Sequence, residues 1–463
     1  MQLPRLSTAQ AAARLGVKPQ TLYAYVSRGV ITSEHSEGGS TFDALAVEAL
    51  ADSRRPRAPA AGTGTGPAFR ADTGRPLMVI DSPLTLIRDD DLFFRGQRAS
   101  DLARTASFEQ AVEILWQSGA GGDVAFSPDR QIVSRARLAG DLLGPSAHLV
   151  DRLAATVLIA ASYDPLRADL ARDAVFSAGR RLIGELVGAL PLRGEAAPAD
   201  ASLARHLWSR LSAVSPTDDD VRLLDSVLVL SMDHDLATST LAARVAASAR
   251  ATPYAALGAA LGAADSSLHG AASTAAVALL RESMESGQPE RALASRIRAA
   301  QGLPGFGHLL YRERDPRADF VFEALRRLPR FRTAATAAGR LSAIVRSRLP
   351  RPANLDLALA VVAIGAEMPD DAGQVVFAVA RTAGGSRTSS TNTSRHRCGC
   401  GPSRDTPGWS HPADRPGHAA GFAHLLSSDF TVRDTQSRLC IWPPHRAPAP
   451  PPKAPSTGAS SPR

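Results

Sequence analysis

Cysteine, lysine and aromatic residues are scarce in this sequence. All three cysteines lie beyond residue 390 (Cys398, Cys400 and Cys440), so the rest of the chain offers neither a disulfide bridge nor a thiol nucleophile. No apolar run reaches the roughly 18 residues that a membrane-spanning helix needs, and the N-terminus lacks the apolar core of a signal peptide. These absences exclude disulfide scaffolds, cysteine-dependent catalysis in the body and membrane-spanning proteins. They predict a cytoplasmic location.

The 463 residues are instead rich in alanine and leucine, with 44% hydrophobic, 21% charged and 5% aromatic residues. This composition is typical of a soluble, mostly helical protein, and the length allows two or three domains of roughly 100–200 residues each. The net charge of +8 is concentrated at the end, because residues 385–463 carry +6 and leave the rest near neutral. Net charge therefore does not indicate that the body binds nucleic acid.

Composition divides the chain into four zones. Residues 1–51 form a compact helix-turn-helix start, and residues 52–76 are a linker rich in proline, glycine and arginine. Residues 77–384 show helical spacing of apolar positions, as after the capping residue Ser107. Residues 385–463 are rich in serine, proline and arginine without periodicity, and we expect them to be disordered. The predicted fold class is all-α.

The N-terminal zone has the pattern of two helices joined by a tight turn. Ser7 or Thr8 caps a first helix that Gly16 ends, and Pro19 opens a second helix that Gly29 ends. The stretch LSTAQAAARLGVKPQTLYAYVSRGVI resembles the winged-helix heads of MerR and excisionase-type regulators, in which the second helix enters the DNA major groove. Two interpretations stay open: this zone binds DNA, or it is a small docking module for the enzyme or another protein.

Three histidines of the body have unusual neighbours. They are His234 in MDHDLATSTLAARV, His269 in SSLHGAAS and His308 in PGFGHLLYRERDPRA. A lone histidine is most often a satisfied structural residue. Glycines beside His269 and His308, however, permit backbone bends and close ligand approach that core packing alone would not need. Arg317 and Arg381 add cations suited to carboxylate binding, so the set indicates chemistry on a small polycarboxylate.

These segments resemble the citrate synthase family. DHDLATSTLAARV, LHGAAS, GFGH followed by DPRA, PANLDLALA and FAVARTAG occur in that family's order and spacing, and FFRGQRASDLARTASFEQAVEILW resembles its opening segment. The resemblance covers about Leu77 to Gly384. It implies the family's helical fold with a large and a small domain, and a homodimer. It also implies a reaction of oxaloacetate with acetyl-CoA or propionyl-CoA, in which the thioester is a substrate and neither a metal nor a cofactor is needed.

The resemblance also implies a role for each candidate residue. His269 would donate a hydrogen bond to the thioester oxygen while Asp356 removes the methyl proton, and His308 would polarise the oxaloacetate carbonyl. The residues implied to bind oxaloacetate are His234, Arg317 and Arg381, and those implied to contact CoA are Gly305, Phe306 and Gly307. A thioester α-proton is too weakly acidic for a carboxylate to remove unless the enolate is stabilised at the same time.

Two features leave alternatives open. Asp315 is a competing base, although its position two residues before Arg317 favours a local ion pair. The sequence also departs from the family pattern after LHG, where residues 271–273 read Ala-Ala-Ser and lack the usual asparagine, and at Leu309, where a basic residue often follows GFGH. The choice between acetyl and propionyl groups therefore stays open, because one methylene is worth only about 1–3 kcal/mol in a pocket.

A second function class is compatible with the same sequence. The chain could be a DNA-binding regulator that uses the synthase body as a metabolite sensor or dimerisation scaffold. Retention of the six residues assigned to catalysis and oxaloacetate binding favours the enzyme, since a sensor could have lost the base Asp356.

The similarity to the family stops at Gly384, where a tryptophan and a helix normally follow. Only two of the 53 basic residues are lysines, which is typical of a GC-rich gene whose wrong reading frames encode arginine, proline, glycine and serine. Permissible codons for residues 385–408, read two bases later, give LAHLVDEYLAAPLRLRPVARYTG, which resembles the family's ending. We therefore interpret the tail as the product of a single-base frameshift. Its His396, Cys398 and Cys400 match no standard zinc spacing, and no metal site is predicted.

Overall fold

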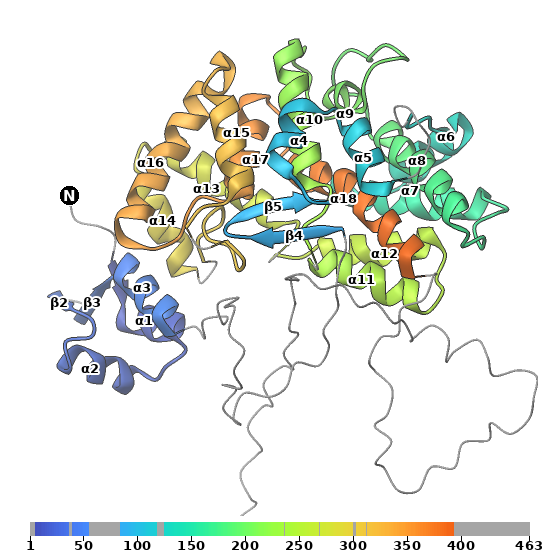
Figure 1. Ribbon diagram of the computed structural model, residues 1–463. Helices are drawn as coiled ribbons and strands as arrows, with labels where there is room; N and C mark the ends of the chain where they lie inside the picture. Colours follow the sequence, from blue (N-terminus) through green and yellow to red (C-terminus); the bar gives the residue numbers. More distant parts are fainter. Residues whose placement is uncertain are drawn as a thin grey trace, which may run out of the picture.

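The structure is a computed structural model of the chain (Figure 1). It describes residues 5–36, 39–54, 84–117, 125–235, 237–267, 269–299, 302–311 and 313–392, with side chains up to residue 385. The predicted mostly helical architecture is confirmed, and two three-stranded antiparallel sheets accompany the helices in the described ranges. None of the described helices is long and apolar enough to span a membrane.

The N-terminal unit combines three helices with a small sheet. Its elements are β1 (Arg5–Ser7), α1 (Thr8–Leu15), α2 (Pro19–Ser27), β2 (Ser33–Ser36), β3 (Gly39–Asp43) and α3 (Ala44–Arg54). The two predicted helices are present: Ser7 caps α1 in a capping box with Gln10, Gly16 ends it in the left-handed conformation, and Pro19 opens α2. Strand β3 lies between β1 and β2. Helix α3 runs to Arg54, so the first three residues of the predicted linker are helical.

The body begins with a second sheet and continues as helices. The sheet consists of β4 (Thr85–Arg88), β5 (Asp91–Phe94) and β6 (Gln97–Arg98). The first helices are α4 (Ala99–Thr105), α5 (Phe108–Trp116), α6 (Arg130–Asp141), α7 (Leu149–Tyr163), α8 (Arg172–Ala189), α9 (Leu203–Leu211), α10 (Asp218–Ser231), α11 (Thr238–Ser248) and α12 (Pro253–Ala264). They are followed by α13 (Ala272–Ser286), α14 (Pro289–Arg298), α15 (Pro316–Leu325), the 3₁₀ helix η1 (Pro329–Phe331), α16 (Arg332–Arg348), α17 (Leu355–Gly365) and α18 (Ala372–Asn392).

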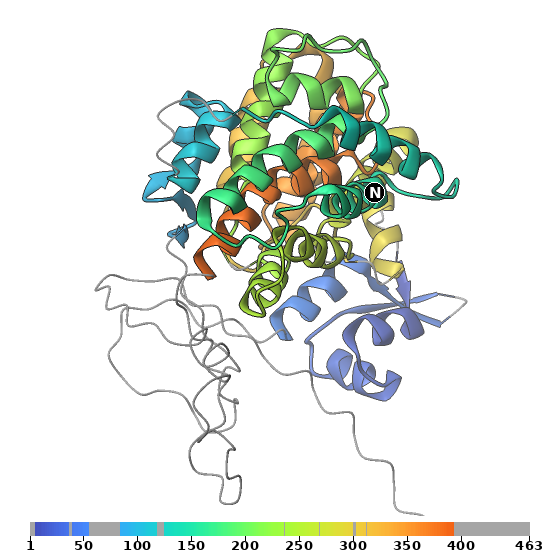
Figure 2. The same cartoon turned by 90° about the vertical axis from the view of Figure 1, so that its right-hand side faces the viewer.

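Helix α18 runs through the centre of the body in both views (Figures 1 and 2). It packs against α8, α10, α11, α12 and α13, while α17 packs against α13, α15 and α16. The Trp116 indole N–H donates to the Ala383 carbonyl at 2.8 Å. A Cβ at Gly384 would lie 2.6 Å from the Met232 carbonyl oxygen, so glycine is needed where α18 passes the end of α10.

Helix α18 extends beyond the boundary predicted at residue 385. It continues to Asn392, so the first eight residues of the expected disordered tail are helical. The physical reason is that no proline occurs between Pro369 and Pro402, and nothing in that stretch removes a helix hydrogen bond. The rest of the predicted tail, including His396, Cys398 and Cys400, lies outside the described residues.

The N-terminal unit rests on one end of the body. Helices α1 and α3 pack against α14, and α3 also packs against α16. Helix α2 lies on the side of the unit that faces away from the body (Figure 1).

Candidate active site

His234, His308 and Tyr311 form a cluster of rings inside the body. His234 lies in the turn between α10 and α11 and is buried, with its Nε2 2.9 Å from the Tyr311 hydroxyl. The ring centroids of His234 and His308 are 4.9 Å apart in an edge-to-face arrangement, and those of His308 and Tyr311 are 4.8 Å apart. The structure therefore brings together two of the three predicted histidines.

The glycines beside the histidines are required by packing as well as by backbone geometry. Gly305 and Gly307 have φ values of 85° and 80°, in the left-handed region that favours glycine. A Cβ at Gly305 would lie 2.9 Å from the Leu357 Cβ, and one at Gly270 would lie 2.4 Å from the Ala264 carbonyl oxygen. The prediction that core packing would not need these glycines is therefore wrong for Gly270 and Gly305. At Gly307 a Cβ would meet only the Arg351 side chain, at 3.4 Å, and the positive φ is the reason for glycine.

His308 is held as a neutral hydrogen-bond donor. The backbone N–H of Leu310 donates to His308 Nδ1 at 3.0 Å. A ring nitrogen that accepts carries no proton, so the neutral imidazole keeps its proton on Nε2. Burial, together with the positive Arg317, lowers the pKa of His308 to about 4, while Asp315 opposes the shift. The Nε2–H group is therefore available near neutral pH.

The segment that carries Asp356 is fastened to the His308 loop. Asn354 caps α17, because its side-chain oxygen accepts from the Asp356 N–H at 3.0 Å. The Asn354 amide group donates to the Gly307 carbonyl at 3.0 Å, and the Gly307 N–H donates to the Pro352 carbonyl at 2.7 Å. Two segments that are distant in sequence therefore lie side by side through backbone pairing.

Arg317 is the charged centre of this group. It forms a two-point ion pair with Asp315, with 2.9 Å from Nε to Oδ1 and 2.8 Å from Nη2 to Oδ2, and both residues are buried. The Leu355 N–H also donates to Asp315 Oδ2 at 3.1 Å, so both carboxylate oxygens of Asp315 are engaged. Asp315 is the local partner of Arg317, as its spacing indicated. Burial raises the pKa of Asp356 to about 6, and Arg317 acts in the opposite direction.

His269 lies in a neighbouring group at the turn between α12 and α13. Its Nε2 is 2.8 Å from the Ser239 hydroxyl, and its ring meets Phe377 of α18 edge-on at 5.0 Å. Burial, and then the positive charge of Arg381, lower the pKa of His269 to about 4. His269 is therefore also neutral at physiological pH.

Arg381 is a buried cation that is only partly satisfied. Its Nε donates to the Ser231 carbonyl at 3.0 Å, and its guanidinium lies over the Phe377 ring at 4.4 Å. Both terminal nitrogens, Nη1 and Nη2, are buried without a hydrogen-bond partner among the described residues. Burial lowers the pKa of Arg381 to about 10, although Asp233 acts in the opposite direction. A buried guanidinium with two free nitrogens has the donor geometry for an anionic ligand.

Electrostatics connect the two groups. Burial is the main reason why the pKa of His234 lies well below its ordinary value. Repulsion from positive charge on its neighbours acts in the same direction, and these neighbours are Arg317, His308, Arg381 and His269. No hydrogen bond or ring contact joins His269 to His308 or Asp356 within the described residues. In the same ranges, no group of three or more histidine, cysteine or acidic side chains is arranged to hold a metal ion.

The segment assigned to CoA is largely committed to internal contacts. The Gly305 carbonyl accepts from the Asn354 N–H at 3.0 Å, and Gly307 is hydrogen-bonded on both sides as described above. The Phe306 side chain is buried, and its backbone pairs with Ala353. Leu357 fills the position of the missing side chain at Gly305, and the Arg351 stem lies against Gly307, so these residues act mainly in holding the loop.

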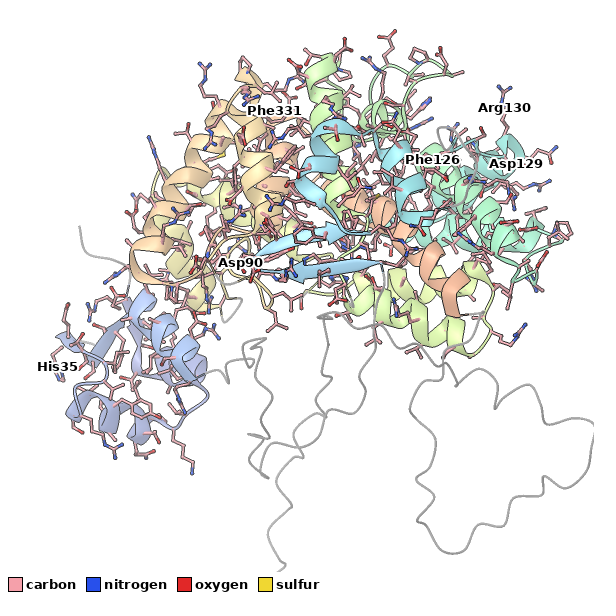
Figure 3. The ribbon with its side chains drawn as sticks, viewed as in Figure 1. His35, Asp90, Phe126, Asp129, Arg130 and Phe331 are labelled. Atoms are coloured by element: carbon pink, nitrogen blue, oxygen red, sulfur yellow. The ribbon has the colours of Figure 1, made fainter. Side chains whose placement is uncertain are left out.

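The β4–β5 hairpin covers this region, and its role was not predicted. Asp90 at the hairpin turn (Figure 3) accepts from the Glu313 N–H at 2.9 Å, and Asp91 pairs with Arg314 at 3.0 Å. Thr85 of β4 donates to Asp233, the residue before His234. The sheet therefore holds both histidine segments in place.

Tyr311 and Ser239 are site residues that the sequence analysis did not single out. Both lie inside motifs that it quoted, Tyr311 in GFGHLLY and Ser239 in DHDLATST. A hydroxyl that close in sequence to a candidate histidine was the available signal. Their partners, His234 and His269, come from other elements, so only the fold reveals the pairs.

Comparisons with known proteins agree with this geometry. Residues 75–391 match the family model described as "Citrate synthase, C-terminal domain". "Citrate synthase 2" of Bacillus subtilis is 25% identical over 322 residues, covering 65% of this chain and 87% of that protein. "Citrate/2-methylcitrate synthase" of the same organism is 26% identical over 263 residues, covering 52% of this chain and 69% of that protein.

Solved structures show the same fold. Citrate synthase from Thermotoga maritima superposes with a TM-score of 0.55 at 22% identity, covering 74% of this chain and 96% of that one. The enzyme from Thermoplasma acidophilum, in a ternary complex with carboxymethyl coenzyme A and oxaloacetate, gives a TM-score of 0.58 at 21% identity. It covers 73% of this chain and 95% of that one.

Proposed function

Because the chain belongs to the citrate synthase family, we propose that this site condenses oxaloacetate with an acyl-CoA and releases CoA. The observation that carries the proposal is Arg381, whose buried guanidinium leaves two nitrogens without a partner. A buried cation is costly unless it is paired, and a dicarboxylate that met both Arg381 and Arg317 would supply that partner. Citrate synthases use the CoA thioester as a substrate and need no cofactor.

Asp356 and His269 would act together on the thioester. A pKa of about 6 leaves Asp356 ionised near neutral pH, yet makes it a stronger base than an ordinary aspartate. With the Ser239 hydroxyl donating to Nε2, the neutral ring would carry its proton on Nδ1 and would donate it to the thioester oxygen. Transfer of the α-proton to Asp356 then gives an enolate, whose oxygen is stabilised by the hydrogen bond from His269.

His308 would act on the oxaloacetate carbonyl. Its Nε2–H donates to the carbonyl oxygen and transfers the proton to it as the enolate carbon attacks the carbonyl carbon. The new carbon–carbon bond gives a citryl-CoA thioester, and water then hydrolyses it to the tricarboxylate and CoA. His234, held by Tyr311, would fix the position of the keto acid.

The test is CoA release with acetyl-CoA and with propionyl-CoA, each in the presence and absence of oxaloacetate. We expect release that depends on oxaloacetate, and its ratio between the two thioesters gives the acyl preference. Arg381→Met should raise the KM for oxaloacetate. Arg326→Met, which removes an exposed cation directly after α15, is the control. Oxaloacetate-independent release, or none with either thioester, would contradict the proposal.

The homodimer that the resemblance implies is part of this proposal. Several leucines on and next to α6 and α7 are exposed, namely Leu138, Leu142, Leu158 and Leu166. Because α6 packs against α7, these residues supply apolar surface for a second copy. Sedimentation of the unaltered chain should give the mass of a dimer, and Leu158→Glu should lower that mass towards the monomer. The same mass for the chain and the variant would argue against this interface.

The DNA-binding alternative has less support in the N-terminal unit. Two of its basic residues are engaged within the unit, since Arg5 pairs with Glu34 at 2.7 Å and Arg14 pairs with Glu48. Lys18 and Arg28 remain exposed around α2, which faces away from the body. Sequence-independent DNA binding grows with the number of phosphates neutralised, so two cations predict weak binding. A gel shift of the whole chain at two salt concentrations tests this.

The altered tail completes the proposal. A frameshift at codon 385 would replace the family's ending. By the resemblance, that ending carries an arginine through which the partner subunit would bind a substrate carboxylate, so its loss would impair the chain as written. Resequencing that codon decides the point, because an intact frame with no neighbouring tryptophan codon would end the idea.

A further inference from the structure

A buried ion cluster fastens the N-terminal unit to the body, and the proposed chemistry does not use it. Arg351, between α16 and α17, donates to Glu48 at 2.8 Å and to Asp52, both on α3. Glu48 is completely buried and also accepts from Arg14 of α1 at 2.6 Å. The two guanidinium groups hold the pKa of Glu48 below its ordinary value in spite of its burial. Loss of one partner would leave a buried charge uncompensated, so the cluster is a firm link.

Arg351 also touches the two segments that carry the proposed acid and base. Its side-chain stem covers Gly307, because a Cβ at that glycine would lie 3.4 Å from the Arg351 Cγ. The next residue, Pro352, accepts the Gly307 N–H at 2.7 Å, and Asn354 bonds the Gly307 carbonyl from the other side. Gly307 directly precedes His308. The side chain and the backbone around Arg351 therefore join α3 to the backbone pairing beneath His308.

A second ion pair at the same boundary lacks this connection. Arg348, at the end of α16, lies 3.1 Å from Asp43, and its side chain is 40% exposed. No contact joins Arg348 to the His308 loop within the described residues. Two arginines three positions apart therefore hold the same unit, but only Arg351 reaches the site.

We propose that Arg351 is a positioning residue, through which α3 of the N-terminal unit fixes the His308 loop against the Asp356 segment. The catalytic consequence rests on the proposed condensation, whereas the structural consequence does not. Because a displacement of about 1 Å between reacting groups costs up to roughly 100-fold in rate, a link that holds two loops in register changes turnover without touching substrate. The N-terminal unit is then a built-in part of the enzyme's site geometry.

The experiment compares Arg351→Gln and Asp52→Asn with the control Arg348→Gln in the full chain. Hydrogen exchange in residues 302–311 and 350–358 should speed up by roughly tenfold in the first two variants and stay unchanged in the control. With acyl-CoA and oxaloacetate, kcat should fall about tenfold in the first two variants with a smaller change in KM. Arg351→Lys, which keeps one charged contact, should recover part of the loss.

Each outcome bears on one of the two proposals. Faster exchange confined to residues 5–54, with both loops unchanged, would show that Arg351 only attaches the unit and would overturn the positioning role. A lack of CoA release in the unaltered chain would count against the condensation, and the exchange data would still decide the role of Arg351. If Arg351→Gln fails to fold, Asp52→Asn decides, because the Asp52 carboxylate is partly exposed and its loss leaves the Glu48 contact intact.

Discussion

The protonation states of the site follow from where each residue lies. His269 and His308 are half-buried beside arginines, which keeps both rings neutral, while burial makes Asp356 a stronger base. A carboxylate base must be ionised to act. Turnover should therefore fall as the pH decreases through about 6, even though the histidines titrate only near 4.

Replacing the proposed base tests this assignment. Asp356→Asn should lower kcat by orders of magnitude, with oxaloacetate binding little changed, because the amide cannot accept the α-proton. The variant should also lose the fall in activity near pH 6. Asp319→Asn, an exposed aspartate on the neighbouring α15, is the control and should behave like the unaltered chain. Turnover close to normal in Asp356→Asn would remove Asp356 from the mechanism.

Tyr311 gives a second prediction at this scale. Its hydroxyl contacts His234, and its ring lies under the Arg317 guanidinium at 5.2 Å. Tyr311→Phe keeps the ring and deletes the hydrogen bond, so we expect the KM for oxaloacetate to rise roughly tenfold with a smaller change in kcat. Tyr163→Phe, which removes an exposed hydroxyl bonded to Arg135, should leave both constants unchanged. Equal KM values in the two variants would refute a role for the His234 contact.

The resemblance supplied the roles of the predicted site residues, and the contacts it could not supply are those between distant elements. Asp315 and Arg317 are two residues apart, and Asn354 caps the turn that carries Asp356, so both relations lie within one motif. The pairing of Ser239 with His269 and the contact of Arg351 with α3 join distant elements. No local pattern encodes these contacts, because they arise only when the helices pack.

Among the secondary-structure elements, the helix N-termini could be predicted from the sequence, whereas the β4–β5–β6 sheet could not. Ser7, Ser107 and Pro19 act where the sequence placed them, because a cap depends on residues within one turn. The strands of the β4–β5–β6 sheet have only two to four residues each, too few for an alternating pattern to stand out. Their assignment depends on pairing with each other over the site.

Helix α8 carries a buried acid that makes stability depend on pH. Burial is the main cause that raises the pKa of Glu185 from its ordinary 4.5 to about 7, and the negative charges of Asp129 and Asp164 add to it. The backbone N–H of Asp129 and the charge of Arg181 oppose the shift. Asp129 and Phe126 lie over this part of the body (Figure 3), and a Cβ at Gly184 would lie 2.5 Å from the Phe126 carbonyl oxygen. The close packing around Glu185 therefore leaves little room for a water molecule that could solvate its carboxylate.

The sign of the effect follows from proton binding. Between pH 4.5 and about 7 the native state holds more protons at Glu185 than the unfolded state, so stability falls as the pH rises through that window. Glu185→Gln should raise the melting temperature at pH 8 more than at pH 5. Glu195→Gln, which replaces an exposed acid, should leave the melting temperature unchanged at both pH values. A Glu185→Gln variant with an unchanged pH slope would show that the native group titrates normally.

For the whole molecule, the last prediction concerns the end of the chain. The resemblance implies that a dimer partner contributes an arginine to a substrate carboxylate from near its C-terminus, and in the chain as written no residue matches that arginine. Losing one charge-assisted contact to a buried dianion costs about 3–5 kcal/mol, because the carboxylate is left without a partner. That loss corresponds to a rate difference of at least about 100-fold.

The test is a comparison of the chain as written with a version whose frame is restored from codon 385. The restored chain should release CoA at least about 100-fold faster, and we expect it to sediment as a more stable dimer. Arg348→Gln in both backgrounds is the control, since its ion pair lies far from α18 in sequence and outside the proposed site. Equal activity and equal sedimentation would mean that the tail as written is functional and that the frameshift interpretation is wrong. The effect of the tail is also separable from that of Arg351, because hydrogen exchange in residues 302–311 should depend on Arg351 in both versions.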